Sequence, residues 1–357
     1  MPDLSDLVIS LRTLETSAAE IADPLAAQIL AKPIDRAQLP LGADQLQRAL
    51  ELTQQTAAQL RKQIGRSAPV RGSAQFAAGQ YLKQLRARFR YWSQTIQAVR
   101  QIGKGRAWPL FPRRRPIHDL AAPAERIADR VFTQMHRVIN PTEQADAAAD
   151  LGCWPDIPTN VSLFLEHAHL AYRVLLAQGH RGPIRFVDIG CGGATKVALA
   201  AQLFAHCDGI EYDPGYAAVA RRTLALLGAA RCRIIEGDAL AFDDYAAYDV
   251  LYMYRPIRDA ARLIELEERV LATARPGAVL LAPYDSFQVR TEGYQRIKFG
   301  VSVLGVDAAD GEAIRRATLR IGPHIAHPDE PVPKEADWLA PLWRACEANG
   351  ISPDAYE

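Results

Sequence analysis

Three acidic side chains stand near the ends of three short apolar runs that read as buried strands. Asp188 lies within the run 184–189, Glu211 ends the run 207–211, and Asp238 follows the run 231–235. In an open α/β sheet, ligands bind at the edge where the carboxyl ends of the strands meet. We therefore predict that the three carboxylates converge on one ligand, because packing alone does not require an acid at each of these positions.

A glycine-rich loop follows the first of these runs. Gly190, Gly192 and Gly193 come directly after it, and helix-compatible residues resume at Ala194. Glycine permits positive φ and a close approach of the backbone, and the first turn of a helix has free N–H groups. The pattern predicts a loop that turns from a strand into a helix and presents its N–H groups to a nucleotide-like ligand.

The details of the loop argue against a dinucleotide. The sequence reads G-C-G-G-A-T, with Thr195 where the third glycine of G-x-G-x-x-G would stand. Asp188, just ahead of the glycines, would repel a pyrophosphate but suits a cationic ligand with an amino group. Glu211 comes 23 positions after Asp188, where a doubly wound fold places the carboxylate that accepts from ribose hydroxyls.

Residues 187–192, Glu211 and Gly237-Asp238 together resemble the motifs of class I S-adenosylmethionine-dependent methyltransferases, over about residues 156–320. The resemblance implies that S-adenosylmethionine is the cofactor and that the chain is a methyltransferase. Asp188 and the loop would hold the methionine moiety, Glu211 the ribose hydroxyls and Asp238 the adenine amino group. The expected cofactor-binding set is Asp188, Gly190, Cys191, Gly192, Glu211, Tyr212, Asp238 and Ala239. The alternative is a related sheet with a degenerate, empty site.

The segment after the fourth expected strand, 249–253, reads Tyr254-Arg255-Pro256-Ile257. In many amino-directed members of the resembled family this segment is Asn/Asp/Ser-Pro-Pro-aromatic. Arg255 cannot accept a hydrogen bond from an amino group, so it either binds a carboxylate or phosphate of the methyl acceptor or faces solvent. Our candidate catalytic residues are Tyr254, Arg255 and Asp285, with Tyr284 beside the last; no metal site is expected, because the five cysteines lack C-x-x-C spacing.

The elements around these residues predict an α/β fold. We expect a doubly wound, mostly parallel sheet at residues 151–325, a preceding all-helical domain at 1–150 and a C-terminal tail at 326–357. Helices are expected at 4–30, 43–64 and 74–102, and the last strand of the sheet at 297–303. The N-terminus lacks a signal peptide and no apolar run is long enough for a membrane span, so we expect a cytoplasmic protein with no membrane contact.

The net charge of +1 conceals a strong asymmetry. Residues 52–118 contain fourteen Lys and Arg and no Asp or Glu, which leaves the rest of the chain at −13. We call residues 52–118 the basic arm. Its aromatic residues, such as Tyr81, Phe89 and Trp92, could stack on bases while the cations contact phosphates. Alternatively, the arm packs on acidic parts of the same chain, or mediates dimerisation, and its aromatics are core.

Three functional hypotheses follow. The chain is a methyltransferase of a nucleic acid or of a nucleic-acid-associated acceptor, reached through the basic arm. Otherwise it is a methyltransferase of a small molecule or protein, or a scaffold that keeps a cofactor fold without turnover. The sequence does not name the methyl acceptor.

Overall fold

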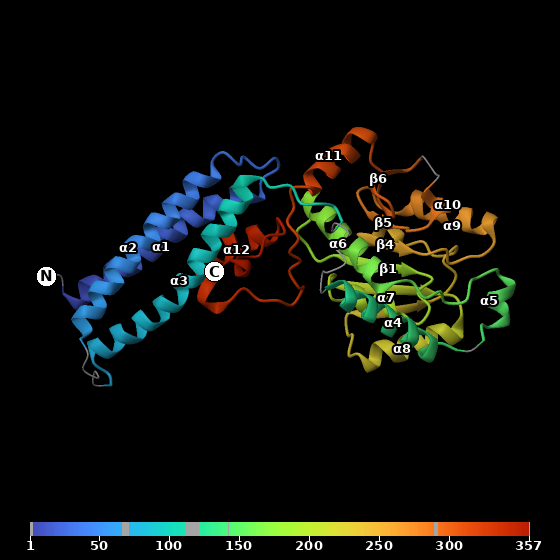
Figure 1. Ribbon diagram of the computed structural model, residues 1–357, viewed down its shortest axis with the longest axis horizontal. Coiled ribbons are helices and arrows are strands. Elements are labelled where there is room, and N and C mark those ends of the chain that lie inside the picture. Colours follow the sequence, from blue (N-terminus) through green and yellow to red (C-terminus); the bar gives the residue numbers. More distant parts are fainter. Residues whose placement is uncertain (1–2, 66–70, 112–120, 142, 289–291, 357) are drawn as a thin grey trace. The chain divides into compact units, whose positions relative to one another are not determined.

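The computed structural model divides the chain into two compact units (Figure 1). It describes residues 3–65, 71–111, 121–141, 143–288 and 292–356. The first unit joins Met1–Ala107 to Arg320–Glu357, and the second is Trp108–Leu319. These units differ from the boundaries expected at 150/151 and 325/326: the residues from Trp108 to 150 belong to the unit with the sheet, and the C-terminal tail belongs to the unit with the N-terminal helices.

The first unit is helical in its described residues. Its long helices are α1 (Leu4–Leu30), α2 (Leu39–Ile64) and α3 (Ala74–Lys104), and α12 (Ala340–Glu347) packs on α1 and α3. The 3-10 helices η2 (Lys334–Leu339) and η3 (Pro353–Ala355) also contact α3. Residues 31–38 separate α1 from α2, and Pro40 occupies the first turn of α2, where its missing N–H costs no hydrogen bond.

Aromatic residues of the basic arm belong to the core of the first unit. Trp92 is fully buried and contacts Trp338 edge to face, with ring centroids 4.8 Å apart. The Tyr81 hydroxyl donates to Glu15, and Arg88 forms an ion pair with the same carboxylate at 2.7 Å. Trp92 is therefore part of the core and not a platform for bases, whereas Tyr81 is half-buried and hydrogen-bonded within the unit. Arg113, Arg114 and Arg115 of the arm lie outside the described residues.

The second unit is built on a seven-stranded sheet with the order β3-β2-β1-β4-β5-β7-β6. Strands β1 to β5 run parallel, and β7 is antiparallel to both β5 and β6. The strands are β1 (Arg185–Ile189), β2 (His206–Glu211), β3 (Cys232–Glu236), β4 (Val250–Met253), β5 (Val279–Leu281), β6 (Tyr294–Lys298) and β7 (Val301–Leu304). The strand order reverses beside β1, so a ligand crevice is expected between β1 and β4.

One strand was expected over residues 297–303, and the structure has two in that region. The chain turns at Phe299 and Gly300, and Gly300 has a φ of +74°, a conformation that side chains with a Cβ rarely adopt. A Cβ on Gly300 would also lie 2.6 Å from Nε2 of the buried His167. The apolar residues that predicted one strand therefore belong to two strands, β6 and β7, which are joined by a tight hairpin.

Helices cover both faces of the sheet. Helices α6 (Val161–Ala177), α7 (Thr195–Ala200) and α8 (Pro214–Leu226) share a core cluster with Phe186 on one face. Helices α9 (Ala260–Thr273) and α10 (Asp285–Gln288), with the 3-10 helix η1 (Tyr245–Ala247), share the other cluster with Val187. Burial on both faces explains why the parallel strands read as nearly continuous apolar runs.

Three further helices complete the second unit. Helix α11 (Ala308–Thr318) contacts α6 and β6, and α4 (Ala121–Ile139) contacts α6. The short helix α5 (Asp146–Asp150) follows α4 in the chain. None of the helices in the described part of the chain is both long and apolar enough to cross a membrane.

Arg173 on α6 connects the two ends of the second unit. Its side chain is 2% exposed, and its guanidinium donates to the carbonyl oxygens of Pro109 at 2.8 Å and Thr318 at 3.2 Å. Burial lowers the pKa of Arg173 to about 10, so the group keeps its charge at neutral pH. The buried guanidinium thus satisfies carbonyl groups from the start and the end of the unit.

We expect Arg173→Met to destabilise the protein by about 3 kcal/mol, because the freed carbonyl groups stay buried without donors. Urea unfolding of the intact chain measures the change. Arg222→Met removes an exposed arginine on α8 and should change stability by less than about 0.5 kcal/mol. Equal, small effects of both substitutions would contradict this role of Arg173.

Candidate functional site

A pocket that is open to solvent lies at the carboxyl ends of β1, β2 and β4. It is formed entirely by the second unit. All eight residues expected to bind the cofactor line it, and so do Tyr254 and Arg255. The pocket is also lined by residues that the sequence did not single out, among them Trp154, Asp156, Thr159, Lys196, Tyr216 and Tyr252.

Glu211 at the end of β2 holds the glycine loop in place. One carboxylate oxygen accepts from the N–H of Gly192 at 2.8 Å, and the other accepts from the N–H of Asp213 at 2.9 Å. Burial raises the pKa of Glu211 to about 7, although the two backbone hydrogen bonds oppose the shift. Each oxygen retains a second lone pair, so the carboxylate can still accept hydroxyl groups from a ligand.

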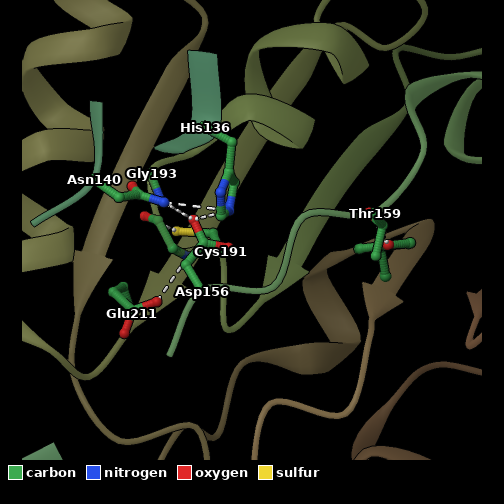
Figure 2. Close-up of polar contacts among 9 residues, drawn as sticks. His136, Asn140, Asp156, Thr159, Cys191, Gly193 and Glu211 are labelled. Carbon is green, nitrogen blue, oxygen red and sulfur yellow. Dashed lines mark hydrogen bonds and ion pairs between the residues drawn. The ribbon is translucent and has the colours of Figure 1, made fainter. Parts of the chain in front are cut away.

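Asp156 lies against the same loop from the other side (Figure 2). Its Oδ2 accepts from the N–H of Gly193 and from the side-chain amide of Asn140, both at 2.8 Å, and lies 3.0 Å from Nε2 of His136. His136 lies on α4, and Asn140 is the first residue after that helix. Burial raises the pKa of Asp156, but the hydrogen bonds from His136, Gly193 and Asn140 outweigh it and leave the pKa below its ordinary value.

The glycines are needed because parts of the chain itself approach the loop. A Cβ on Gly192 would collide with the Asp156 carboxylate, and one on Gly190 would lie 2.6 Å from Cβ of Pro256. Both glycines also have positive φ, +51° and +79°. The sequence suggested that the loop N–H groups face a ligand, but those of Gly192 and Gly193 donate to carboxylates of the protein. The loop is therefore poorly suited to bind a pyrophosphate.

Asp188 and Lys196 form a separated pair of opposite charges in the pocket. Asp188 is 3% exposed and Lys196 is 8% exposed, yet among the described residues no ion pair within 4 Å joins either group to a partner. Burial raises the pKa of Asp188 well above its ordinary value, and the Lys196 charge opposes that shift. Burial lowers the pKa of Lys196, while the charges of Asp156 and Asp188 oppose that change. A ligand ammonium near Asp188 and a ligand carboxylate near Lys196 would give each of these side chains an ion-pair partner.

The end of β3 carries the third expected acid. Asp238 lines the pocket beside Ala239, and its Oδ1 accepts from the N–H of Leu240 at 2.9 Å. This turn-type contact orients the carboxylate and leaves its other oxygen available. The three strand-end acids thus line one pocket, as their positions in the sequence indicated.

The segment after β4 is held by the segment that leads to Asp156. Residues 152–154 pair with 256–258: the N–H of Trp154 donates to Pro256 O at 3.2 Å, and the N–H of Arg258 donates to Gly152 O at 2.6 Å. Arg255 has a φ of +49°, which is uncommon outside glycine and costs conformational energy. We call this pairing of 152–154 with 256–258 the clasp.

The candidates beyond β5 do not reach the pocket. Tyr284 is buried, and its hydroxyl donates to Glu267 on α9 at 3.0 Å. Asp285 begins α10 and is exposed, and it is not among the pocket-lining residues. Contrary to the expectation, Asp285 and Tyr284 therefore do not line this pocket, although the Tyr284 ring lies 6.3 Å, centroid to centroid, from that of Tyr254, which does. Tyr252, which precedes the clasp on β4, lines the pocket instead, and its hydroxyl lies 3.5 Å from Oγ1 of Thr159.

Stability should depend on pH through Glu211. Its pKa of about 7 in the folded protein exceeds the ordinary value of 4.5, so the folded state binds this proton more tightly than the unfolded state. The free energy of unfolding should therefore fall as pH rises from about 4.5 to about 7. Glu211→Gln cannot titrate and should lose this part of the decrease.

Urea unfolding at about pH 5 and about pH 8 tests the expectation for both proteins. The decrease between the two pH values should be smaller in Glu211→Gln than in the wild type. Glu265→Gln, which changes an exposed carboxylate on α9, should keep the wild-type decrease. A Glu211→Gln variant that keeps it too would contradict the assignment.

No protein-family model matches the chain, and no curated protein matches it. Among solved structures, an RNA methyltransferase from Salinibacter ruber in complex with S-adenosyl-L-homocysteine is 21% identical, over 42% of this chain and 91% of that chain, with a TM-score of 0.32. The amino pentose methyltransferase CalS10 from Micromonospora echinaspora is 20% identical, over 51% of this chain and 64% of that one, with a TM-score of 0.29. A SAM-dependent methyltransferase from Thiobacillus denitrificans is 20% identical, over 31% of this chain and 46% of that one, with a TM-score of 0.25.

The chain spans less than two thirds of the second and third of these proteins. The likenesses concern the fold alone. The second unit itself has a doubly wound sheet whose single antiparallel strand, β7, lies between β5 and β6.

Proposed function

We propose that the protein is an S-adenosylmethionine-dependent methyltransferase. The observation that carries this proposal is the separated pair of Asp188 and Lys196, both buried in the pocket and both without an ion-pair partner within 4 Å among the described residues. A buried charge without a partner is costly, so the pocket is suited to a ligand that supplies both missing charges. A free amino-acid group, with its ammonium and carboxylate, has that pattern.

The remaining polar residues suit the nucleoside part of the same cofactor. Glu211 would accept from the ribose hydroxyls while it holds Gly192, and Asp238 would accept from the adenine amino group. Asp188 would bind the ammonium of the methionine moiety and Lys196 its carboxylate. A dinucleotide fits less well, because the N–H groups of Gly192 and Gly193 are taken by Glu211 and Asp156.

S-adenosylmethionine, when bound, supplies a methyl group on a positively charged sulfur. The protein then has to hold the acceptor in line with that methyl group and keep water out. Tyr252 and Tyr254, which precede the clasp, and Ile257 within it form part of the pocket wall and would do both. A general base is needed only for an acceptor that is protonated at its nucleophilic atom. Tyr254 is the candidate there, because Asp285 lies outside the pocket.

Calorimetry with two ligands tests the assigned role of Lys196. S-adenosylhomocysteine carries the amino-acid group, whereas 5′-methylthioadenosine has the same nucleoside without it. Lys196→Met should weaken binding of S-adenosylhomocysteine by about tenfold or more, since a charge-assisted contact is lost, and leave binding of 5′-methylthioadenosine nearly unchanged. Lys298→Met, at an exposed lysine of the same unit, serves as the control.

Two results would contradict the proposal. NAD could bind while neither adenosyl ligand does, or Lys196→Met could weaken both adenosyl ligands equally. Binding without any methyl transfer to fractionated cell extract would instead favour a scaffold that lacks turnover.

A nucleic-acid acceptor is a second candidate, favoured by one surface feature. Lys83, Arg86 and Arg90 are exposed and recur at helical spacing on one face of α3, and no Asp or Glu occurs in the basic arm. We call these three residues the α3 stripe. Because Trp92 is buried and the Tyr81 hydroxyl is bonded to Glu15, the observation that favours this candidate is the set of possible phosphate contacts and not a stacking platform.

If the α3 stripe binds nucleic acid, affinity should fall steeply with salt. The log–log slope should be about −0.9 per phosphate contacted on duplex DNA and about −0.7 on single strands. Changing Lys83, Arg86 and Arg90 to Gln should reduce the slope by about two to three. A variant with Arg222, Lys298 and Arg316 changed to Gln removes the same charge elsewhere and should keep it. No binding of labelled RNA or DNA at about 50 mM salt would end this candidate.

A further inference from the structure

Two arginines lie beside one tryptophan at the mouth of the pocket. The guanidinium carbons of Arg255 and Arg258 lie 6.0 Å and 5.9 Å from the centroid of the Trp154 ring. Both arginines are exposed, and in the described ranges no carboxylate pairs with either. Asp259, the neighbouring acid, instead accepts from the backbone N–H of Arg262 at 2.9 Å. The mouth therefore carries two uncompensated positive charges around an aromatic face.

The clasp fixes this group in place. Trp154 and Arg258 lie on its two paired segments and are tied by backbone hydrogen bonds to Pro256 and Gly152. Arg255 stands between β4 and the clasp with its strained positive φ, and Pro256 packs on Gly190 of the glycine loop. A strained backbone at a pocket-lining position is typical of a functional site. Here it places an arginine at the pocket, where it is one of the lining residues.

The charges divide the pocket into two regions. Asp156, Asp188, Glu211 and Asp238 line the pocket toward the strand ends together with Lys196, whereas Arg255 lines it at the clasp and Arg258 lies beside Trp154 without lining it. The four carboxylates outnumber the Lys196 ammonium, which the carboxylate of the cofactor would neutralise, so a second anion is repelled there and attracted by the two guanidiniums. A ligand with an acidic group would thus be oriented with that group at the clasp and the rest of the molecule toward the strand ends.

We propose that the methyl acceptor is a small molecule that carries a carboxylate or phosphate group on or next to a planar ring. Arg255 binds the anion bidentately, Arg258 adds to the positive field, and Trp154 packs on the ring. This inference rests on the proposed function only where it identifies the ligand as the methyl acceptor. The anion site itself does not depend on that function. Arg255 is thus a specificity residue of the acceptor side and not part of the cofactor site.

Fragment binding tests the site without the acceptor. The intact protein is saturated with S-adenosylhomocysteine and titrated with benzoate, phenyl phosphate, acetate and benzamide, with binding followed by ligand-observed NMR. We expect benzoate or phenyl phosphate to bind at least about tenfold more tightly than benzamide, which has the ring without the charge, and acetate to bind weakly.

Substitutions assign the contacts. Arg255→Asn tolerates the positive φ and should weaken the preferred anionic fragment by about tenfold, whereas Arg255→Lys should recover part of the loss. Trp154→Leu should remove the advantage of benzoate over acetate. Arg222→Gln, at an exposed arginine on α8, should have no effect. Unchanged affinity of Arg255→Asn for S-adenosylhomocysteine shows that the pocket is still folded.

The outcomes separate this inference from the proposed function. Benzamide that binds as tightly as benzoate, or anion binding that survives Arg255→Asn unchanged, overturns the anion site and leaves the cofactor assignment intact. If S-adenosylhomocysteine does not bind, the titration is repeated without it. Arg255-dependent binding of the anions then supports the site while the methyltransferase proposal fails.

Discussion

The contact of the Asp156 carboxylate with the glycine loop is the interaction on which the pocket depends. It uses the N–H of Gly193, and it requires the missing Cβ of Gly192. His136 and Asn140 hold the carboxylate from the side of α4 and keep its pKa low. A free loop of this kind binds anions. Here the protein's own carboxylate takes that place, so the glycine loop, unlike the Arg255 side of the pocket, does not bind phosphate groups.

The buried charges of the pocket contribute little to the stability of the fold, and they are better explained by ligand binding. Removing a charge from water costs several kcal/mol, and a well-packed apolar pair is often as stable as a buried ion pair. Asp188 and Lys196 gain less, because among the described residues no ion pair within 4 Å joins them, although each charge acts on the pKa of the other group. Their pKa values are displaced in opposite directions, each toward the neutral form. A ligand that brings an ammonium to Asp188 and a carboxylate to Lys196 would favour the charged form of both groups.

The sequence predicted the sheet and its acidic edge, because both are local patterns. Strands β1 to β5 follow apolar runs, and the acids at their ends need only the direction of a parallel sheet. Asp156 and Trp154 could not be predicted this way, since they lie in an irregular segment that reaches the loop only through tertiary structure. Lys196 looked like an ordinary residue of a helix start. Asp285 follows β5 as expected, but α10 begins there and carries its side chain to the surface.

The segment 152–156 connects the two halves of the proposed site. Its last residue closes the glycine loop, and its first three residues form the clasp that holds Pro256 beside Gly190. The cofactor loop and the Arg255 loop are thus supported by one short stretch of chain. Besides the hydrogen bonds of the clasp, this segment is anchored at Trp154 by Gln144 and at Asp156 by His136 of α4 and by Asn140. A rearrangement of α4 would therefore alter the acceptor mouth and the glycine loop together, although α4 itself contributes no residue to the pocket lining.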